Sequence, residues 1–263
     1  MHLITSFPIK NHPRIEEYGT CLRLNLFNRS IKKITIVTDV FSVPFNLGFT
    51  NLIRDFKISF NKNKCQSKGN EILVIDSWPK YNDMFKVANS IKSDYSIITN
   101  GDIFLDESIS FLKNINWESP KKMIALTRRE SSLSHDPIEN HISLHSWKEQ
   151  EKPHSTDGVC DFLSILEMRP NKFRGSADVW AFKDKIKEFG EDVELGTSYC
   201  DHAIASLAEQ SGYEVYNPCL EIAANHLHKS TAGRHEKAKT QKIYRKGIEI
   251  PKLTPIIKLK DMH

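Results

Sequence analysis

The sequence has no apolar run long enough to cross a membrane and no closely spaced cysteine pair. A membrane-spanning helix needs about 20 consecutive apolar residues. The five cysteines, at positions 21, 65, 160, 200 and 219, are odd in number, widely spread, and include no CxxC pair. This pattern indicates neither a zinc ribbon nor a disulfide framework. We therefore expect a reducing, cytoplasmic compartment for this chain.

The N-terminus also lacks the features of a secretion signal, and the chain shows no internal repeat. The first residues, MHLITSFP, have no basic n-region and are interrupted by Pro8, so we expect a first strand there and not a signal peptide. The chain has 263 residues, with 39% hydrophobic and 27% charged side chains. Such values are typical of a soluble globular protein with one large domain, or one domain and an appendage.

Strand-like and helix-like patterns alternate through the first half of the sequence. Apolar or β-branched runs predict strands at residues 3–7, 31–38, 71–77 and 95–99. Helical periodicity predicts helices at residues 14–28, 50–56 and 81–91, and residues 61–70 are polar and predict a loop. This alternation favours a parallel sheet with helices on both faces. Right-handed crossovers then place the carboxyl ends of the strands, where ligands bind, along one edge.

Acidic residues follow three of these predicted strands, namely Asp39, Asp76 and Asp102. Asp102 belongs to the cluster Asn100-Gly101-Asp102, directly after the run at 95–99. A carboxylate there can hold a divalent metal, and Gly101 can let the backbone approach a ligand closely. Alone, such a cluster also fits an Asx turn, and a single acid is often only a helix cap. Three acids on one edge are more than capping explains.

The second half of the chain predicts a further strand at 122–127 and a long polar loop at 128–158. Four histidines lie in that loop without metal-ligand spacing, so we expect a solvated loop that selects the acceptor or acts as a lid. Strand-like runs follow at 161–168 and 173–182, then a helix at 199–212 that ends at Gly212, and strands at 213–217 and 221–228. His226 and His228 share a face of the last strand. The net charge of the chain is +4, and the run 229–246 is strongly basic, with seven Lys or Arg residues against one Glu. Residues 251–263 predict a tail.

In their order, these features resemble the GT-A fold of nucleotide-sugar-dependent glycosyltransferases, in particular the family-2-like group. The resemblance covers most of residues 2–235. The matching segments, in chain order, are Ile36-Val37-Thr38-Asp39, Val87-Ala88-Asn89-Ser90-Ile91, Tyr95-Ser96-Ile97-Ile98-Thr99-Asn100-Gly101-Asp102, Gly175-Ser176-Ala177-Asp178, Cys200-Asp201, Gly212-Tyr213, Pro218, the pair His226 and His228, and Arg234.

The resemblance implies a Rossmann-like α/β fold with a mostly parallel central sheet, helices on both faces and a smaller acceptor-side sheet. It implies a catalytic domain at 1–235, divided into a nucleotide-binding half (1–127) and an acceptor half (128–235), and a basic tail at 236–263. Asp201 is the implied general base, and Asp178 a second acid that binds sugar hydroxyls or acts as base. Asp102 with His226 or His228 would hold Mn²⁺ or Mg²⁺. The implied nucleotide and donor ligands are Thr5, Phe7, Asp39, Asn89, Asn100, Gly101, Asp102, Ser176 and Arg234.

The chain departs from the family pattern at two positions, where Asn100 and Cys200 replace acids. The implied partners are a UDP- or GDP-sugar and a glycan or polysaccharide acceptor. The run 229–246 could also contact an anionic membrane surface. A sugar nucleotidyltransferase is an alternative, but the segment after the first strand has no glycine-rich loop. The two lost acids also suit a catalytically silent carbohydrate- or partner-binding module. We expect no nucleic-acid binding, since the basic run has no aromatic platform. Trp180 fits either an acceptor-stacking residue or a core residue.

Overall fold

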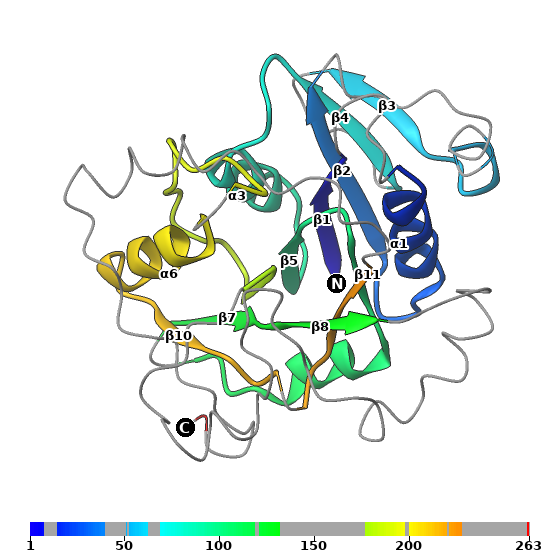
Figure 1. Cartoon of the computed structure of the whole chain (residues 1–263). Coiled ribbons are helices and arrows are strands. Elements are labelled where there is room, and N and C mark those ends of the chain that lie inside the picture. Colours follow the sequence, from blue (N-terminus) through cyan, green and yellow to red (C-terminus); the bar gives the residue numbers. More distant parts are fainter. Residues whose placement is uncertain are drawn as a thin grey trace.

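The computed structural model describes residues 1–7, 15–39, 51, 53–62, 69–118, 121–131, 177–197, 200–219, 221–227 and 262. It shows the predicted α/β fold of Rossmann-like GT-A type, with one large, mostly parallel sheet and one small sheet (Figure 1). Among the described segments, no helix is both long and apolar enough to span a lipid bilayer.

Eight strands form the large sheet. In spatial order they are β10 (Glu214–Tyr216), β7 (Lys122–Leu126), β9 (Val179–Lys183), β5 (Tyr95–Thr99), β1 (His2–Ser6), β2 (Lys33–Asp39), β4 (Glu71–Ile75) and β3 (Ser59–Lys62). All neighbours pair in parallel except β9, which is antiparallel to both β5 and β7. Because β9 runs the other way, its first residue lies at the carboxyl ends of β5 and β7. The residues just before β9 therefore enter the edge at which ligands bind in such sheets.

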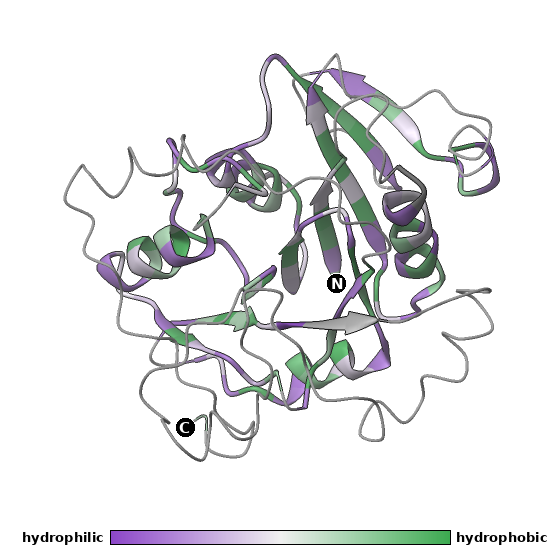
Figure 2. Cartoon of the chain, viewed as in Figure 1, coloured by the Kyte–Doolittle hydropathy of each residue, from purple (hydrophilic) through white to green (hydrophobic). Residues whose placement is uncertain are grey.

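Alternating strand residues build one core on each face of the large sheet. Ile98 belongs to the core covered by α3 (Tyr81–Ser90) and α6 (Cys200–Gln210), whereas Ile97 belongs to the core that contains Leu22 of α1 (Ile15–Phe27) and Leu112 of the 3₁₀ helix η1 (Glu107–Asn114). The hydrophobic bands along β2 and β4 are visible in Figure 2. Burial on both faces explains why these strands read as continuous apolar runs in the sequence.

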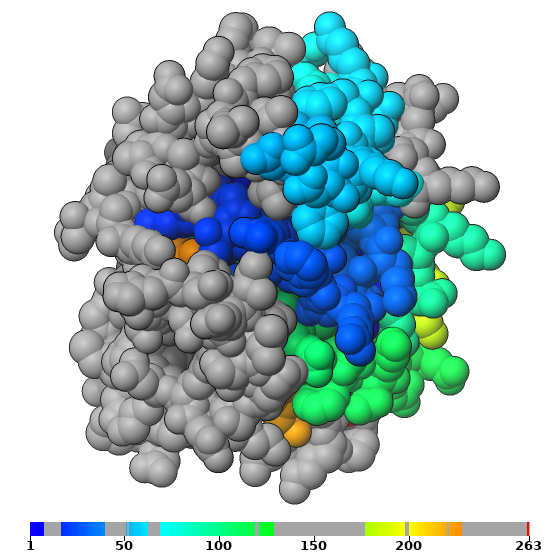
Figure 3. Space-filling model, turned by 90° about the vertical axis from the view of Figure 1, so that its right-hand side faces the viewer, coloured from blue at the N-terminus to red at the C-terminus, as the bar shows by residue number. Residues whose placement is uncertain are grey.

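The small sheet consists of β6 (Ile103–Leu105), β11 (Ala224–Leu227) and β8 (Arg128–Ser131), in that spatial order. Strand β11 is antiparallel to β6 and parallel to β8. Helix α1 holds the outer edge of β6, because Asn25 Nδ2 donates to the Ile103 carbonyl and Asn25 Oδ1 accepts from the Leu105 N–H, each at 2.9 Å. On the face shown in Figure 3, the blue atoms of the α1 region lie between the cyan atoms of the β3 region and green atoms further along the chain.

Most of the predicted elements are present in the described segments, with bounds shifted by a few residues. Gly212 ends α6 with a φ of 86°, as its position predicted. Two predictions are corrected, since the predicted loop 61–70 begins inside β3 and the predicted loop 128–158 begins with β8. Neither β6 nor η1 was predicted from the sequence. The predicted strand 161–168 and most of the loop 128–158 lie outside the described residues.

Candidate active site

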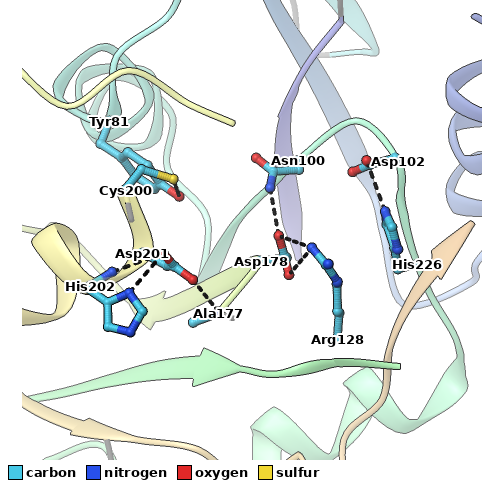
Figure 4. Close-up of polar contacts among 10 residues, drawn as sticks. All are labelled: Tyr81, Asn100, Asp102, Arg128, Ala177, Asp178, Cys200, Asp201, His202 and His226. Carbon is cyan, nitrogen blue, oxygen red and sulfur yellow. Dashed lines mark hydrogen bonds and ion pairs between the residues drawn. The ribbon is translucent and has the colours of Figure 1, made fainter. Parts of the chain in front are cut away.

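The turn that follows β5 brings Asp102 against His226 of β11 (Figure 4). Asp102 Oδ2 lies 3.1 Å from His226 Nε2, and both side chains are largely buried. The Leu227 N–H donates to the Asp102 carbonyl at 3.0 Å, which fixes the backbone of this turn to β11. Two residues that are 124 positions apart in the chain therefore form one carboxylate–imidazole pair at the carboxyl edge of the large sheet.

Gly101 has a packing role that differs from the predicted one. A Cβ atom at this position would collide with the Ser6 carbonyl oxygen and would lie 2.6 Å from Cδ1 of Tyr18. The atoms that a side chain at this position would meet are therefore protein atoms, and contact of the Gly101 backbone with a ligand stays a prediction. The absence of a side chain lets the β5 turn pack under the end of β1 and beside α1, which in turn places Asp102.

Asp178 lies between the carboxyl ends of β5 and β7, as the antiparallel direction of β9 requires. Its carboxylate accepts from Asn100 Nδ2 at 2.9 Å on the β5 side. On the β7 side, Nη1 of Arg128 lies 3.3 and 3.4 Å from the two carboxylate oxygens. Burial raises the pKa of Asp178 above its ordinary value, and the positive charge of Arg128 opposes this rise. The amide of Asn100 is thus oriented by the acid on the neighbouring strand.

Asp201 lies in the first turn of α6, and its carboxylate faces the segment that leads into β9. Oδ2 accepts from the Ala177 N–H at 3.0 Å, and Oδ1 accepts from the His202 N–H at 3.1 Å. His202 Nδ1 is 3.4 Å from Oδ1. Burial alone would raise the pKa of Asp201, but the His202 side chain and the two N–H donors together lower it below its ordinary value. This carboxylate is ionised at neutral pH.

Cys200, which replaces an acid of the family pattern, contributes no charge to the site. Its thiol is buried, and Sγ lies 3.9 Å from the Tyr81 hydroxyl at the start of α3. Burial raises the pKa of the Cys200 thiol well above its ordinary value, so the thiol remains protonated. Asp201 is therefore the one acid of this motif that the chain retains.

Figure 4 shows these groups as a row along one edge, from Asp201 through Asp178 to the pair formed by Asp102 and His226. The described residues contain no group of three or more histidine, cysteine or acidic side chains placed to hold a metal ion. The pair Asp102–His226 nevertheless offers one carboxylate oxygen and one imidazole nitrogen side by side, a donor set that suits Mn²⁺. These two residues fit two protein positions of a metal site that phosphate oxygens and water would complete.

Some predicted donor ligands lie away from this row, and two of these predictions are corrected. Asn89 lies at the opposite, amino edge, where its amide donates to the Ile186 carbonyl at 2.8 Å and accepts from the Ile186 N–H at 2.9 Å. Phe7 is 1% exposed and packs against Tyr18 in the core under α1. Neither position suits contact with a nucleotide.

Some of the remaining predicted residues lie within the part of the chain that the structure describes, and others lie outside it. Asp39 ends β2 at the same edge as Asp102, and Thr5 is buried in β1 with a hydroxyl that has no hydrogen-bond partner among the described residues. Trp180 is fully buried between the sheet and the helices α3 and α6. Of the two roles that the sequence left open for it, it therefore has that of a core residue. Ser176, His228 and Arg234 lie outside the described residues.

The sequence analysis missed Arg128, which the structure places in the row. Arg128 follows the strand at 122–127 in the way that Asn100 follows the strand at 95–99. The rule that selected Asp102, a polar residue directly after a buried parallel strand, would have selected Arg128 as well.

Comparisons with known proteins give similarity to solved structures only. Neither a protein-family model nor the sequence of a curated protein matches this chain. Solved structures with similarity include PcManGT, a mannosyltransferase from Pyrobaculum calidifontis in complex with GDP-Man and Mn²⁺, at 12% identity and a TM-score of 0.49, covering 95% of this chain and 65% of that chain. TarS 1–349 of S. aureus, in complex with UDP-GlcNAc, matches at 10% identity and a TM-score of 0.46, covering 89% of this chain and 59% of that chain.

A third similar structure is the inositol-1-phosphate CTP transferase from T. maritima, at 11% identity and a TM-score of 0.44, covering 94% of this chain and 96% of that chain. The similar proteins thus include a mannosyltransferase, a protein in complex with UDP-GlcNAc and a CTP transferase. Similarity at this level concerns the fold and carries no conclusion about substrate or reaction.

Proposed function

We propose that this protein is a glycosyltransferase that moves a sugar from a UDP- or GDP-linked donor to a hydroxyl group of a glycan or polysaccharide. The observation that supports this most is the row of polar groups at the carboxyl edge. Asp102, Asp178, Asp201 and His226 come from four separate parts of the chain, and each is held there by hydrogen bonds or an ion pair. The order of the sequence motifs points to the same chemistry.

A divalent cation is the expected cofactor, with Asp102 and His226 as its protein ligands. When bound, it would neutralise charge that develops on the leaving diphosphate. The three carboxylates of the row also make such a cation necessary for affinity, because they repel an anionic nucleotide. Asn100 carries no charge, so Asp102 is the acid of the Asn100-Gly101-Asp102 cluster that can bind the metal. The side-chain amide oxygen of Asn100 remains suited to accept a hydrogen bond from a ribose hydroxyl.

The chemistry that we propose for the chain's own residues is an inverting displacement. The acceptor hydroxyl oxygen forms a bond to the anomeric carbon as the bond from that carbon to the phosphate oxygen breaks. The electron pair of the broken bond leaves with the nucleoside diphosphate, and the hydroxyl proton passes to the ionised carboxylate of Asp201. Asp178, next to Ala177, lies close enough to this acid to bind sugar hydroxyls during the displacement.

The proposal is tested by measuring donor hydrolysis and transfer with UDP- and GDP-sugars, with and without Mn²⁺. We expect turnover that requires the cation, and a loss of about 100-fold or more in both Asp102→Asn and Asp201→Asn. Asp201→Asn should retain its affinity for the nucleotide diphosphate, whereas Asp102→Asn should lose the part of that affinity that depends on Mn²⁺. Asp55→Asn, an exposed acid paired with Arg54 on the surface, is the matched control and should behave like the wild type.

Two results would contradict the proposal in different ways. Nucleotide binding without hydrolysis or transfer under any condition would favour the silent binding module, which the replaced acids Asn100 and Cys200 also suit. No stabilisation of the fold by any nucleotide diphosphate, with Mn²⁺ present, would exclude a nucleotide-sugar site altogether.

A further inference from the structure

Arg128 lies at the junction of the two sheets, between the metal-binding pair and Asp178. It is the first residue of β8, and it pairs in register with Ala224 of β11. Arg128 therefore shares a face of the small sheet with His226, two residues further along β11. Its side chain is 17% exposed, and the guanidinium reaches Asp178 across the end of β7 (Figure 4). This places a permanent positive charge beside the position at which a metal-bound diphosphate would lie.

The geometry of the contact between Arg128 and Asp178 indicates a weak ion pair, in which another anion can take the place of the Asp178 carboxylate. A single nitrogen, Nη1, approaches both carboxylate oxygens, at 3.3 and 3.4 Å. Charge-assisted hydrogen bonds between arginine and a carboxylate are usually about 2.7–2.9 Å long, and the strongest use two nitrogens. Phosphate groups match the planar guanidinium at least as well as a carboxylate does. A diphosphate beside Asp102 and His226 would therefore compete with Asp178 for Arg128.

We propose that Arg128 is a further donor-binding residue, which pairs with the donor's phosphates and thereby releases Asp178 to bind sugar hydroxyls. This inference rests on the proposed glycosyltransferase function. It couples two events at the site, because Asp178 becomes available only when the nucleotide diphosphate has taken over its partner. The donor then binds before the acceptor, and Asn100 keeps the released Asp178 carboxylate in place through its 2.9 Å hydrogen bond.

The inference predicts opposite effects for the two members of the ion pair. Arg128→Gln should weaken the binding of UDP or GDP, measured calorimetrically with Mn²⁺, by about 10- to 100-fold, because a charged hydrogen-bond donor is lost. Asp178→Asn should strengthen the same binding several-fold, because Arg128 no longer has a competing carboxylate. The double variant should resemble Arg128→Gln, and binding of uridine or guanosine, which carry no phosphate, should not respond to either change.

The controls separate this inference from a structural role and from the proposed function. Arg54→Gln removes an exposed arginine with its own acidic partner and should leave nucleotide affinity unchanged. Arg128→Lys, which preserves the charge, should have a nucleotide affinity between those of the wild type and Arg128→Gln. It replaces Arg128→Gln in the test if that variant folds poorly. Equal weakening in Arg128→Gln and Asp178→Asn would show that the pair only supports the fold and would overturn the inference. A wild-type protein that binds neither UDP nor GDP would overturn the proposed function as well.

Discussion

Two carboxylates near Ala177, those of Asp178 and Asp201, have opposite electrostatic environments. Asp201 accepts two backbone N–H groups, and its pKa is lowered. Asp178 is buried beside one guanidinium, and its pKa is raised. Neighbouring acids whose pKa values are shifted in opposite directions commonly divide the work of a site between them. Here the ionised Asp201 suits proton acceptance, and Asp178 depends on its partners for its charge.

Gly101 shows how strongly a single residue controls the geometry of the site. We expect Gly101→Ala to lower the free energy of unfolding by about 2 kcal/mol or more, because the added Cβ collides with the Ser6 carbonyl and the Tyr18 ring. Relaxation of that collision moves the turn that carries Asp102, so Mn²⁺-dependent nucleotide affinity should fall as well. Denaturant unfolding and calorimetry measure the two effects.

Gly19→Ala is the matched control for this change. Gly19 lies within α1 and has no atom within 4 Å of an added Cβ, so alanine there should be neutral or stabilise the fold by up to about 1 kcal/mol. Unchanged stability and nucleotide affinity in Gly101→Ala would contradict the packing role that we assign to Gly101.

At the scale of elements, the sequence predicted the strands that are buried on both faces of the large sheet, because burial on both faces leaves an apolar pattern in the local sequence. The strands β1, β2, β4, β5 and β7 each contain consecutive apolar residues and are buried over most of their length, and this local pattern does not depend on the rest of the fold. Strands β3 and β8, with the sequences SFNK and RRES, carry no such pattern, because pairing with a neighbour and not hydrophobic burial makes them strands. Elements of this kind are defined by tertiary contacts and cannot be identified from local sequence.

The same distinction explains which site residues could be predicted. Asp102 was predicted at this edge because it follows a buried strand, whereas Asp178 and Asp201 were implied only by the resemblance in motif order. Asn89 was assigned to that edge from a motif, but it ends α3, and a helix that connects parallel strands runs back toward their amino ends. Its position at the opposite edge follows from that direction. The role of each residue in the row remains a prediction.

Asn25 of α1 is a second element-scale feature, since its amide takes the place of a neighbouring strand at the edge of β6. We expect Asn25→Ala to lower the free energy of unfolding by about 2–4 kcal/mol, because it leaves the Ile103 carbonyl and the Leu105 N–H buried without this partner. Asn116→Ala is the control. Asn116 is exposed and, within the described part of the chain, accepts only from the Glu118 N–H, so its loss should cost no more than about 0.5 kcal/mol.

This change in α1 should also affect the site, through β6. Ile103 pairs in register with His226, so displacement of β6 shifts one side of the Asp102–His226 pair. Mn²⁺ affinity should therefore fall in Asn25→Ala and stay unchanged in Asn116→Ala. Equal stability of the two variants under denaturant would show that α1 does not hold β6 in the way that the contacts indicate.

At the scale of the whole molecule, the two edges of the large sheet differ in how their buried charges are compensated. The carboxyl edge gathers three acids whose charges need a cation or a guanidinium for compensation. The amino edge instead has a closed polar network around Glu71, which is fully buried. Glu71 Oε1 lies 2.6 Å from Lys33 Nζ and accepts from the Thr35 hydroxyl at 3.3 Å, while Oε2 accepts from Asn61 Nδ2 at 2.6 Å.

His2 completes this network at its inner end and makes the fold sensitive to acid. Its Nε2 lies 2.9 Å from the Thr35 hydroxyl, and because that hydroxyl donates to Glu71, His2 is the donor in this contact. Nδ1 is buried and has no hydrogen-bond partner within the described segments. Burial, followed by the nearby Lys33 charge, lowers the pKa of His2 to about 3. A proton on Nδ1 would therefore be both desolvated and close to a like charge.

Because the pKa of His2 is lower in the folded chain than in the unfolded chain, the free energy of unfolding depends on pH. Between pH 6.5 and pH 3 the unfolded chain binds a proton at His2 and the folded chain does not, so stability must fall as the pH falls through this range. From pH 7 to pH 5 the contribution of His2 alone is about 2 kcal/mol. His2→Gln removes the titrating group, so its loss of unfolding free energy over the same interval should be smaller than that of the wild type by this amount. Denaturant unfolding at both pH values measures the difference, to which the site acids contribute equally in both proteins. Equal pH dependence of wild type and variant would show that His2 takes up its proton in the folded chain over the same pH range as in the unfolded chain, which its burial and Lys33 should prevent.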